Sequence, residues 1–237
     1  MTDQHELIEL RDRLETEFSD LLAVDLKALG ASQVHIVLVS DTDLTTSGEF
    51  SGLHAPKIGL WLRQFIPSWR GPAPTILIDD GTIERDCESR WHEMRDRFVA
   101  VATHEMAHVV DTPGLFARDD TNTDAPAEQM PPFIVEALRN KEAFYSGHRS
   151  PRFGHGVGWL RACCHLVFRM QQRGWDVYLP SVIDTDFYAI SSTSLYARAL
   201  GDEPARLAHM PLTEVMASPP PRKFLRQWRR DVSRFPV

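Results

Sequence analysis

The feature that most constrains this chain is a pair of histidines, His104 and His108, which stand four residues apart in a long apolar segment. Residues 87–110 contain neither glycine nor proline, and their apolar residues recur at the spacing of a helix with one face in a protein core. Residues four apart lie on the same face of such a helix, one turn from each other. Both imidazoles can therefore reach one metal ion, and Glu105 stands beside that ion.

This run of residues predicts a hydrolytic metal site. The alternative is two core histidines and a bonded glutamate, which would need three polar partners inside an apolar helix, because a buried and unpaired glutamate is costly. We interpret the run as the helix signature of a zinc metallopeptidase, with His104 and His108 as Zn²⁺ ligands and Glu105 as the general base. A catalytic zinc ion takes three protein ligands and a water, so one ligand must come from elsewhere.

The residues themselves leave the third ligand open. The pattern with glycine three residues and histidine six residues after the second histidine is absent, because Asp111 and Gly114 occupy those positions. One alternative is a glutamate from a later helix, as in gluzincins, and the other is a histidine at the start of a long helical stretch. The candidates are Glu136, Glu142, Glu214 and His155.

His155 is part of a second motif, His155-Gly156-Val157-Gly158-Trp159. Together with the run 104–108, this motif resembles the SprT-like (Spartan-type) zinc metallopeptidase domain of the zincin superfamily. The resemblance covers residues 75–173 and implies that His155 is the third zinc ligand in an enzyme that hydrolyses protein or peptide substrates. The chain departs from the family in the long interval between His108 and His155 and in having no C-x-x-C pair, which weakens any implied link to DNA.

Two further residues are expected next to the metal. Asp111 shares the helix face of His104 and His108, so it either accepts a hydrogen bond from a ligand histidine or closes the helix before Pro113. Trp159 lies one turn after His155 and is expected to pack beneath it. Cys163 and Cys164 follow in an apolar helical stretch and are expected to be core residues rather than ligands.

The pattern along the chain predicts an α+β, zincin-like fold, with a small mixed sheet packed on the motif helix and a mostly helical C-terminal part. Residues 4–29 predict an amphipathic helix, and residues 34–40 and 75–79 predict strands. Residues 41–56 predict a loop or a turn before another edge, and residues 79–81 predict a turn. The second strand is either an edge that pairs with extended substrate, as the family implies, or an interior strand. We divide the chain into a metallopeptidase domain, residues 1–173, and a helical extension, residues 174–237, which packs on it and can belong to the same domain.

The net charge and its distribution limit the kinds of partner that the chain is expected to bind. The net charge of −7 disfavours broad nucleic-acid binding, which needs a positive surface. The tail is an exception, because residues 222–237 hold six basic residues against Asp231. The spacing of its apolar residues predicts a short amphipathic helix, which either docks on the chain's own acidic surface or binds a partner or nucleic acid.

The remaining features of the sequence bear on its compartment. Three cysteines make no disulfide framework, no secretory signal is evident, and no apolar run is long enough to cross a membrane. We therefore expect a cytoplasmic protein, while its oligomeric state stays open. The alternative from another functional class is a zincin-shaped protein that binds metal and partners and cleaves nothing.

Overall fold

The computed structural model describes residues 4–28, 31–42, 52–58, 70, 73–88, 90–111, 156–183 and 193–234. Its strands are β1 (His35–Leu38), β2 (Gly52–Ile58) and β3 (Ala73–Ile78), and a short 3-10 helix, η1 (Val39–Asp41), follows β1. Its α-helices are α1 (Gln4–Leu21), α2 (Ala23–Ala28), α3 (Asp80–Asp86), α4 (Trp91–Asp111), α7 (Val157–Gln172), α8 (Leu179–Ile183), α9 (Thr193–Leu200), α10 (Glu203–Arg206), α11 (Leu212–Ala217) and α12 (Arg222–Arg234). The predicted α+β class, with a small sheet and a mostly helical C-terminal part, is confirmed.

The sheet has the order β1-β3-β2 among the described strands. β3 runs parallel to β1, with His35 opposite Thr75, and antiparallel to β2, with Gly52 opposite Ile78. Every residue of β3 is buried, as expected for a central strand. Of the two alternatives for residues 75–79, the interior strand is therefore correct, and the edge strand that would pair with substrate is wrong.

Among the described strands, β2 is the outer antiparallel one, and it overlaps the segment 41–56 that was predicted to be a loop or a turn before another edge. Polar residues and Pro56 concealed the strand in the sequence, because proline has no N–H to donate to a ladder. The pairing of β2 with β3 becomes irregular between Ala55 and Ile58, around that proline. Strands tolerate proline at an edge or at a bulge, and β2 offers both.

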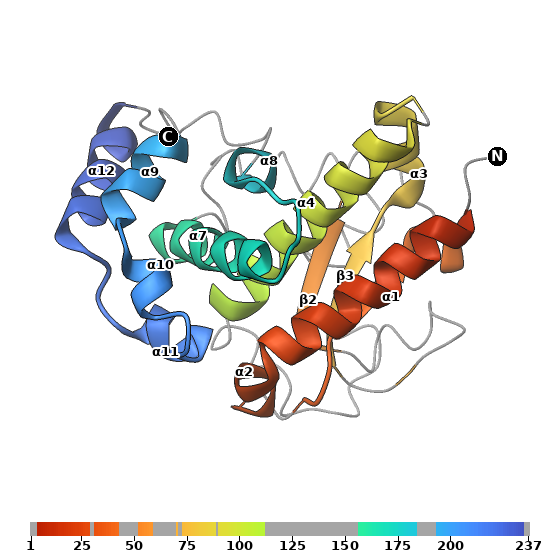
Figure 1. Ribbon diagram of the computed structural model, residues 1–237, viewed down its shortest axis with the longest axis horizontal. Helices are drawn as coiled ribbons and strands as arrows, with labels where there is room; N and C mark the ends of the chain where they lie inside the picture. The colour runs from red at the N-terminus through yellow and green to blue at the C-terminus, as the bar shows by residue number, and fades with distance from the viewer. Residues whose placement is uncertain are drawn as a thin grey trace, which may run out of the picture.

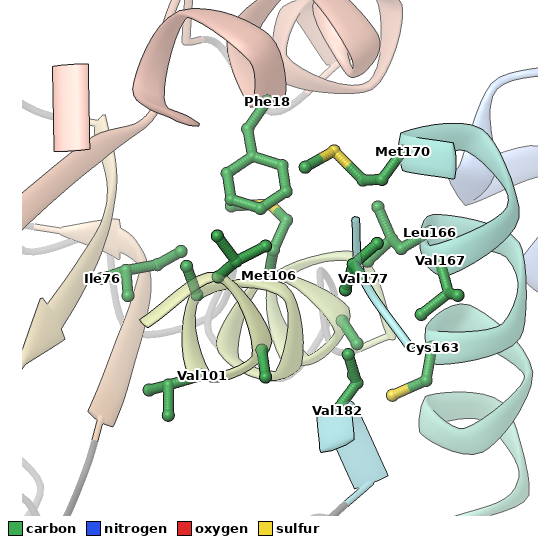
Figure 2. Packing of buried hydrophobic residues seen from close by; sticks show 14 of the residues in the cluster. Phe18, Ile76, Val101, Met106, Cys163, Leu166, Val167, Met170, Val177 and Val182 are labelled. Carbon is green, nitrogen blue, oxygen red and sulfur yellow. The ribbon is translucent and has the colours of Figure 1, made fainter. Parts of the chain in front are cut away.

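Helix α4 runs through the middle of the molecule, between the sheet and the C-terminal helices (Figure 1). It contacts β2 and β3 as well as α7 and α8, while α1 contacts β1 and α4. Figure 2 shows Met106 of α4 at the centre of the core, close to Phe18 of α1, Ile76 of β3 and Met170 of α7. The helix that bears the two histidines is thus held by apolar contacts with elements from both halves of the chain.

Two helix boundaries differ from the prediction. The N-terminal helix, predicted over residues 4–29, is interrupted at Leu22, between α1 and α2. The motif helix begins at Trp91 rather than near Cys87, because a separate helix, α3, precedes it. Asp79 starts α3 by accepting a hydrogen bond from the Thr82 N–H at 2.9 Å, so the predicted turn at 79–81 is a helix start.

The C-terminal helices are joined to the rest by buried polar contacts. Glu203 of α10 accepts a hydrogen bond from Arg161 Nε at 2.7 Å and pairs with His165 Nε2 at 3.0 Å, both on α7. Asp25 of α2 accepts hydrogen bonds from the backbone N–H groups of Leu212 and Thr213 at the start of α11. These contacts connect α11 and α10 to elements that lie far away in the sequence.

Helix α12 is the amphipathic helix predicted for the tail. Phe224 is fully buried, and the buried Asp231 accepts a hydrogen bond from the Tyr196 hydroxyl of α9 at 2.7 Å. The basic side chains of Arg222, Lys223 and Arg226 are exposed, so the docking of α12 is made by its apolar and acidic residues. In the described part of the chain, no helix is long and apolar enough to cross a membrane.

Candidate metal centre

His104 and His108 lie one turn apart near the C-terminal end of α4. Their ring centroids are 5.1 Å apart, which places the two imidazoles side by side. His108 is buried and His104 half-buried, while Glu105 is 7% exposed. Neighbouring apolar residues of the helix, such as Met106 and Val109, are fully buried and fix its rotation. The helix therefore presents two nitrogen donors and a sheltered carboxylate over a single turn.

The orientation of the His104 ring is set by α8. Its Nδ1 lies 2.8 Å from the backbone carbonyl oxygen of Val182. A carbonyl oxygen can only accept, so Nδ1 carries the proton, and the lone pair of the neutral ring is on Nε2. This is the arrangement in which a metal-ligating histidine is usually held, with its other nitrogen bonded to a carbonyl or carboxylate. The tautomer of His104, with its lone pair on Nε2, is thus the one that a metal ligand would need.

Trp159 of α7 forms a wall against both histidines. Its ring is stacked on His108 at a centroid distance of 5.4 Å and meets His104 edge-on at 4.9 Å. The indole Nε1–H donates a hydrogen bond of 3.4 Å to the backbone carbonyl of His104. Trp159 is fully buried. The packing of Trp159 beneath His155 stays a prediction, because His155 lies outside the described part of the chain.

Asp111 makes a contact that sequence reasoning missed. It is the last residue of α4, and its carboxylate accepts a hydrogen bond from the backbone N–H of Trp159. Burial raises the pKa of Asp111, and this hydrogen bond acts in the opposite direction. Of the two expected roles, bonding a ligand histidine or closing α4, neither includes this contact with α7. No sequence pattern announces it, because the acceptor and the donor are 48 positions apart in the chain.

No residue in the described part of the chain joins His104 and His108 as a third metal ligand. In that part of the chain, no three His, Cys, Asp or Glu side chains are grouped so that they could hold a metal ion. Glu214 is exposed on α11 and is not brought into such a group with the two histidines. His155, Glu136 and Glu142 lie outside the described residues.

The cysteines of α7 are core residues, as expected. Cys163 and Cys164 are buried. Burial raises the pKa of the Cys163 thiol well above its ordinary value, and the negative charges of nearby acidic groups, Asp111 and Glu105 among them, act in the same direction. The thiolate form of Cys163 is therefore disfavoured, as suits a thiol packed in the core.

Comparison with known proteins does not assign a family. No family model, no curated protein and no solved structure matches this chain. The function is therefore inferred from the residues and their geometry.

Proposed function

We propose that this protein is a zinc-dependent metallopeptidase of zincin-like fold, similar to the SprT-like domain, and that it cleaves protein or peptide substrates. The observation that carries the proposal is the pair His104 and His108, whose rings lie 5.1 Å apart on one helix face. Val182 orients the first ring so that Nε2 is its donor nitrogen. Imidazole nitrogens are standard zinc ligands. When bound, zinc would supply Lewis-acid chemistry that activates water and polarises the substrate carbonyl.

The protein side chains have separate roles in this proposal. His104 and His108 hold the metal through neutral imidazoles, and His155 is the proposed third ligand, with Glu136 or Glu142 as the alternative. Glu105 accepts the proton of the attacking water and delivers it to the leaving amine. Its side chain is only 7% exposed, so the carboxylate is sheltered from bulk water. Trp159 keeps solvent away from one side of the histidine pair.

The metal content of the purified full chain tests the ligand set. We expect about one zinc per chain in the parent, as for a single catalytic site, and a large loss in His155→Ala. Glu214→Ala is the matched control and should keep its zinc, because Glu214 is exposed on α11. Zinc loss in Glu136→Ala or Glu142→Ala, with none in His155→Ala, would move the third ligand to a glutamate. A parent that takes up no zinc on reconstitution would overturn the proposal.

Hydrolysis of an unfolded protein labelled with a quenched fluorophore tests the chemistry. Glu105→Gln should lower the rate by about 10²–10⁴-fold, because general-base catalysis is lost, while the zinc content stays that of the parent. Glu93→Gln, at an exposed position of the same helix, should keep the parent rate. Undiminished hydrolysis by Glu105→Gln would contradict the role of this residue. A zinc-loaded parent that cleaves nothing would instead favour the non-proteolytic metal-binding protein.

A further inference from the structure

We infer that Asp111 is a positioning residue for the His104–His108 pair and that it acts through Trp159. Its carboxylate caps the first turn of α7 from the end of α4 and thereby holds the indole ring against both histidines. Gly158 is the partner that makes this close approach feasible. The inference rests on the proposed function, because its readout is metal binding by the two histidines.

Helix α7 begins without a capping side chain of its own. Gly156 occupies the N-cap position, where a serine, threonine or aspartate would ordinarily accept a hydrogen bond from the second or third N–H of the helix. Trp159 is the third residue of α7, and its N–H is bonded by the Asp111 carboxylate. Asp111 thus provides from another helix the acceptor that the first turn needs.

The charge of Asp111 points to the same role. As the last residue of α4, it lies at the negative end of the α4 dipole, where a carboxylate is unfavourable. The N-terminus of α7 is the positive end of its dipole and stabilises a carboxylate. The acidic side chain is therefore unfavourable for α4 itself, and its contact with α7 offsets that disadvantage.

Gly158 provides the space for this contact. A Cβ atom added at Gly158 would lie 2.0 Å from Asp111 Oδ1 and 3.0 Å from its Cγ. Both distances are too short for the side chain to stay where it is. Glycine within a helix is less favourable than alanine, so room for Asp111, rather than helix propensity, accounts for the glycine at this position.

The residue that Asp111 holds is the residue that touches the histidines. The Trp159 backbone N–H is bonded to Asp111, and its ring is stacked on His108 and meets the edge of His104. Loss of the cap would loosen the first turn of α7, and the indole would move with it. The two imidazoles would then lose the surface that limits their rotation, and metal binding would weaken.

Co²⁺ binding to the full chain tests this role, because the metal alone is the probe and the visible spectrum of Co²⁺ reports ligand geometry. We expect Asp111→Ala to weaken Co²⁺ binding by about 10–100-fold and to change the spectrum, as when a residue that supports metal ligands is lost. Asp111→Asn should bind Co²⁺ within about threefold of the parent, because the asparagine oxygen accepts the same backbone hydrogen bond. Thermal unfolding of each variant identifies any that does not fold.

Gly158→Ala completes the test as a double-mutant cycle. It should weaken Co²⁺ binding and lower the Tm in the parent, and should do neither in the Asp111→Ala background, where the clashing carboxylate is gone. An Asp111→Asn variant that binds as weakly as Asp111→Ala would overturn the capping role, since it would show that the charge itself is required. Variants that all bind like the parent, or additive effects in the cycle, would also overturn it. A parent that binds no Co²⁺ would overturn the proposed function and the positioning role with it.

Discussion

Single residues of the candidate site are oriented by groups that come from other elements. The Nδ1 of His104 is bonded to the Val182 carbonyl of α8, and the rings of His104 and His108 both rest on Trp159 of α7. A histidine ring on a helix has several rotamers, so two ligands at helical spacing do not by themselves make a site. The surrounding contacts select the rotamers, and Trp159 touches both rings.

We predict that Trp159→Ala destabilises the protein by about 3–5 kcal/mol, the usual cost of truncating a buried aromatic residue. The measurement is the free energy of unfolding from urea denaturation. Trp175→Ala is the matched control: its indole is half-buried and lies 5.0 Å from the Arg13 guanidinium. The control should lose clearly less stability. Equal losses in the two variants would mean that Trp159 contributes no more to stability than a half-buried tryptophan does.

At the scale of elements, helix α1 is attached to β1 by a carboxylate. Glu15 Oε2 accepts a hydrogen bond from the Ile36 N–H at 2.9 Å, and Arg70 contacts both carboxylate oxygens, at 2.5 and 2.7 Å. Burial by itself would raise the pKa of Glu15, but His35, Arg70 and Ile36 together lower it to about 2. Arg70 contacts Glu15 more closely than His35 does, since His35 Nδ1 lies 4.0 Å from Glu15 Oε1.

This attachment predicts a pH dependence of stability. The pKa of Glu15 in the folded protein, about 2, is below its ordinary value of 4.5. Ionised Glu15 therefore stabilises the fold fully above that ordinary value, and the contribution is lost as the pH falls towards 2. The parent should have a higher Tm than Glu15→Gln at pH 7, and the difference should shrink between pH 5 and 2. Glu6→Gln, exposed on the same helix, should show no such convergence. A Tm difference that is constant with pH would contradict the prediction.

At the scale of the whole molecule, one hydrophobic core extends from α1 to α12. It includes Phe18, Met106, Leu166 and Phe224, so it crosses the division at residue 173 that the sequence indicated. Buried polar contacts reinforce this continuity, above all the pair Arg161 and Glu203. We therefore expect the chain to unfold in a single cooperative transition rather than as a domain and an extension.

Replacement of Glu203 tests how strongly the C-terminal helices depend on this pair. Glu203→Ala should cost about 3–5 kcal/mol, because it leaves the buried Arg161 without its charge partner. It also removes the partner of His165, whose pKa is lowered by burial. Glu214→Ala, at an exposed position of α11, should change stability by less than about 0.5 kcal/mol. Urea denaturation measures both variants, and a small effect of Glu203→Ala would show that apolar packing alone holds these helices.

Features that depend on local periodicity could be predicted from the amino-acid sequence alone. The helix bearing His104, Glu105 and His108, the apolar stripe of α1 and the helix after Gly156 all follow from the spacing of apolar residues, which the chain carries within a few turns. The placement of His104 and His108 one turn apart on the same helix face was predictable for the same reason. So were the burial of Cys163 and Cys164 and the amphipathic character of α12.

Contacts between groups that are distant in the sequence could not be predicted and became visible in the folded chain. Strand order depends on pairing between backbone groups, so nothing in residues 75–79 distinguishes a central strand from an edge strand, and Pro56 concealed β2. The Val182 carbonyl that orients His104 is a backbone group and leaves no side-chain pattern in the sequence. The contact between Asp111 and the start of α7 depends on how two helix ends approach each other. That approach is set by packing over the whole core, which no local pattern encodes.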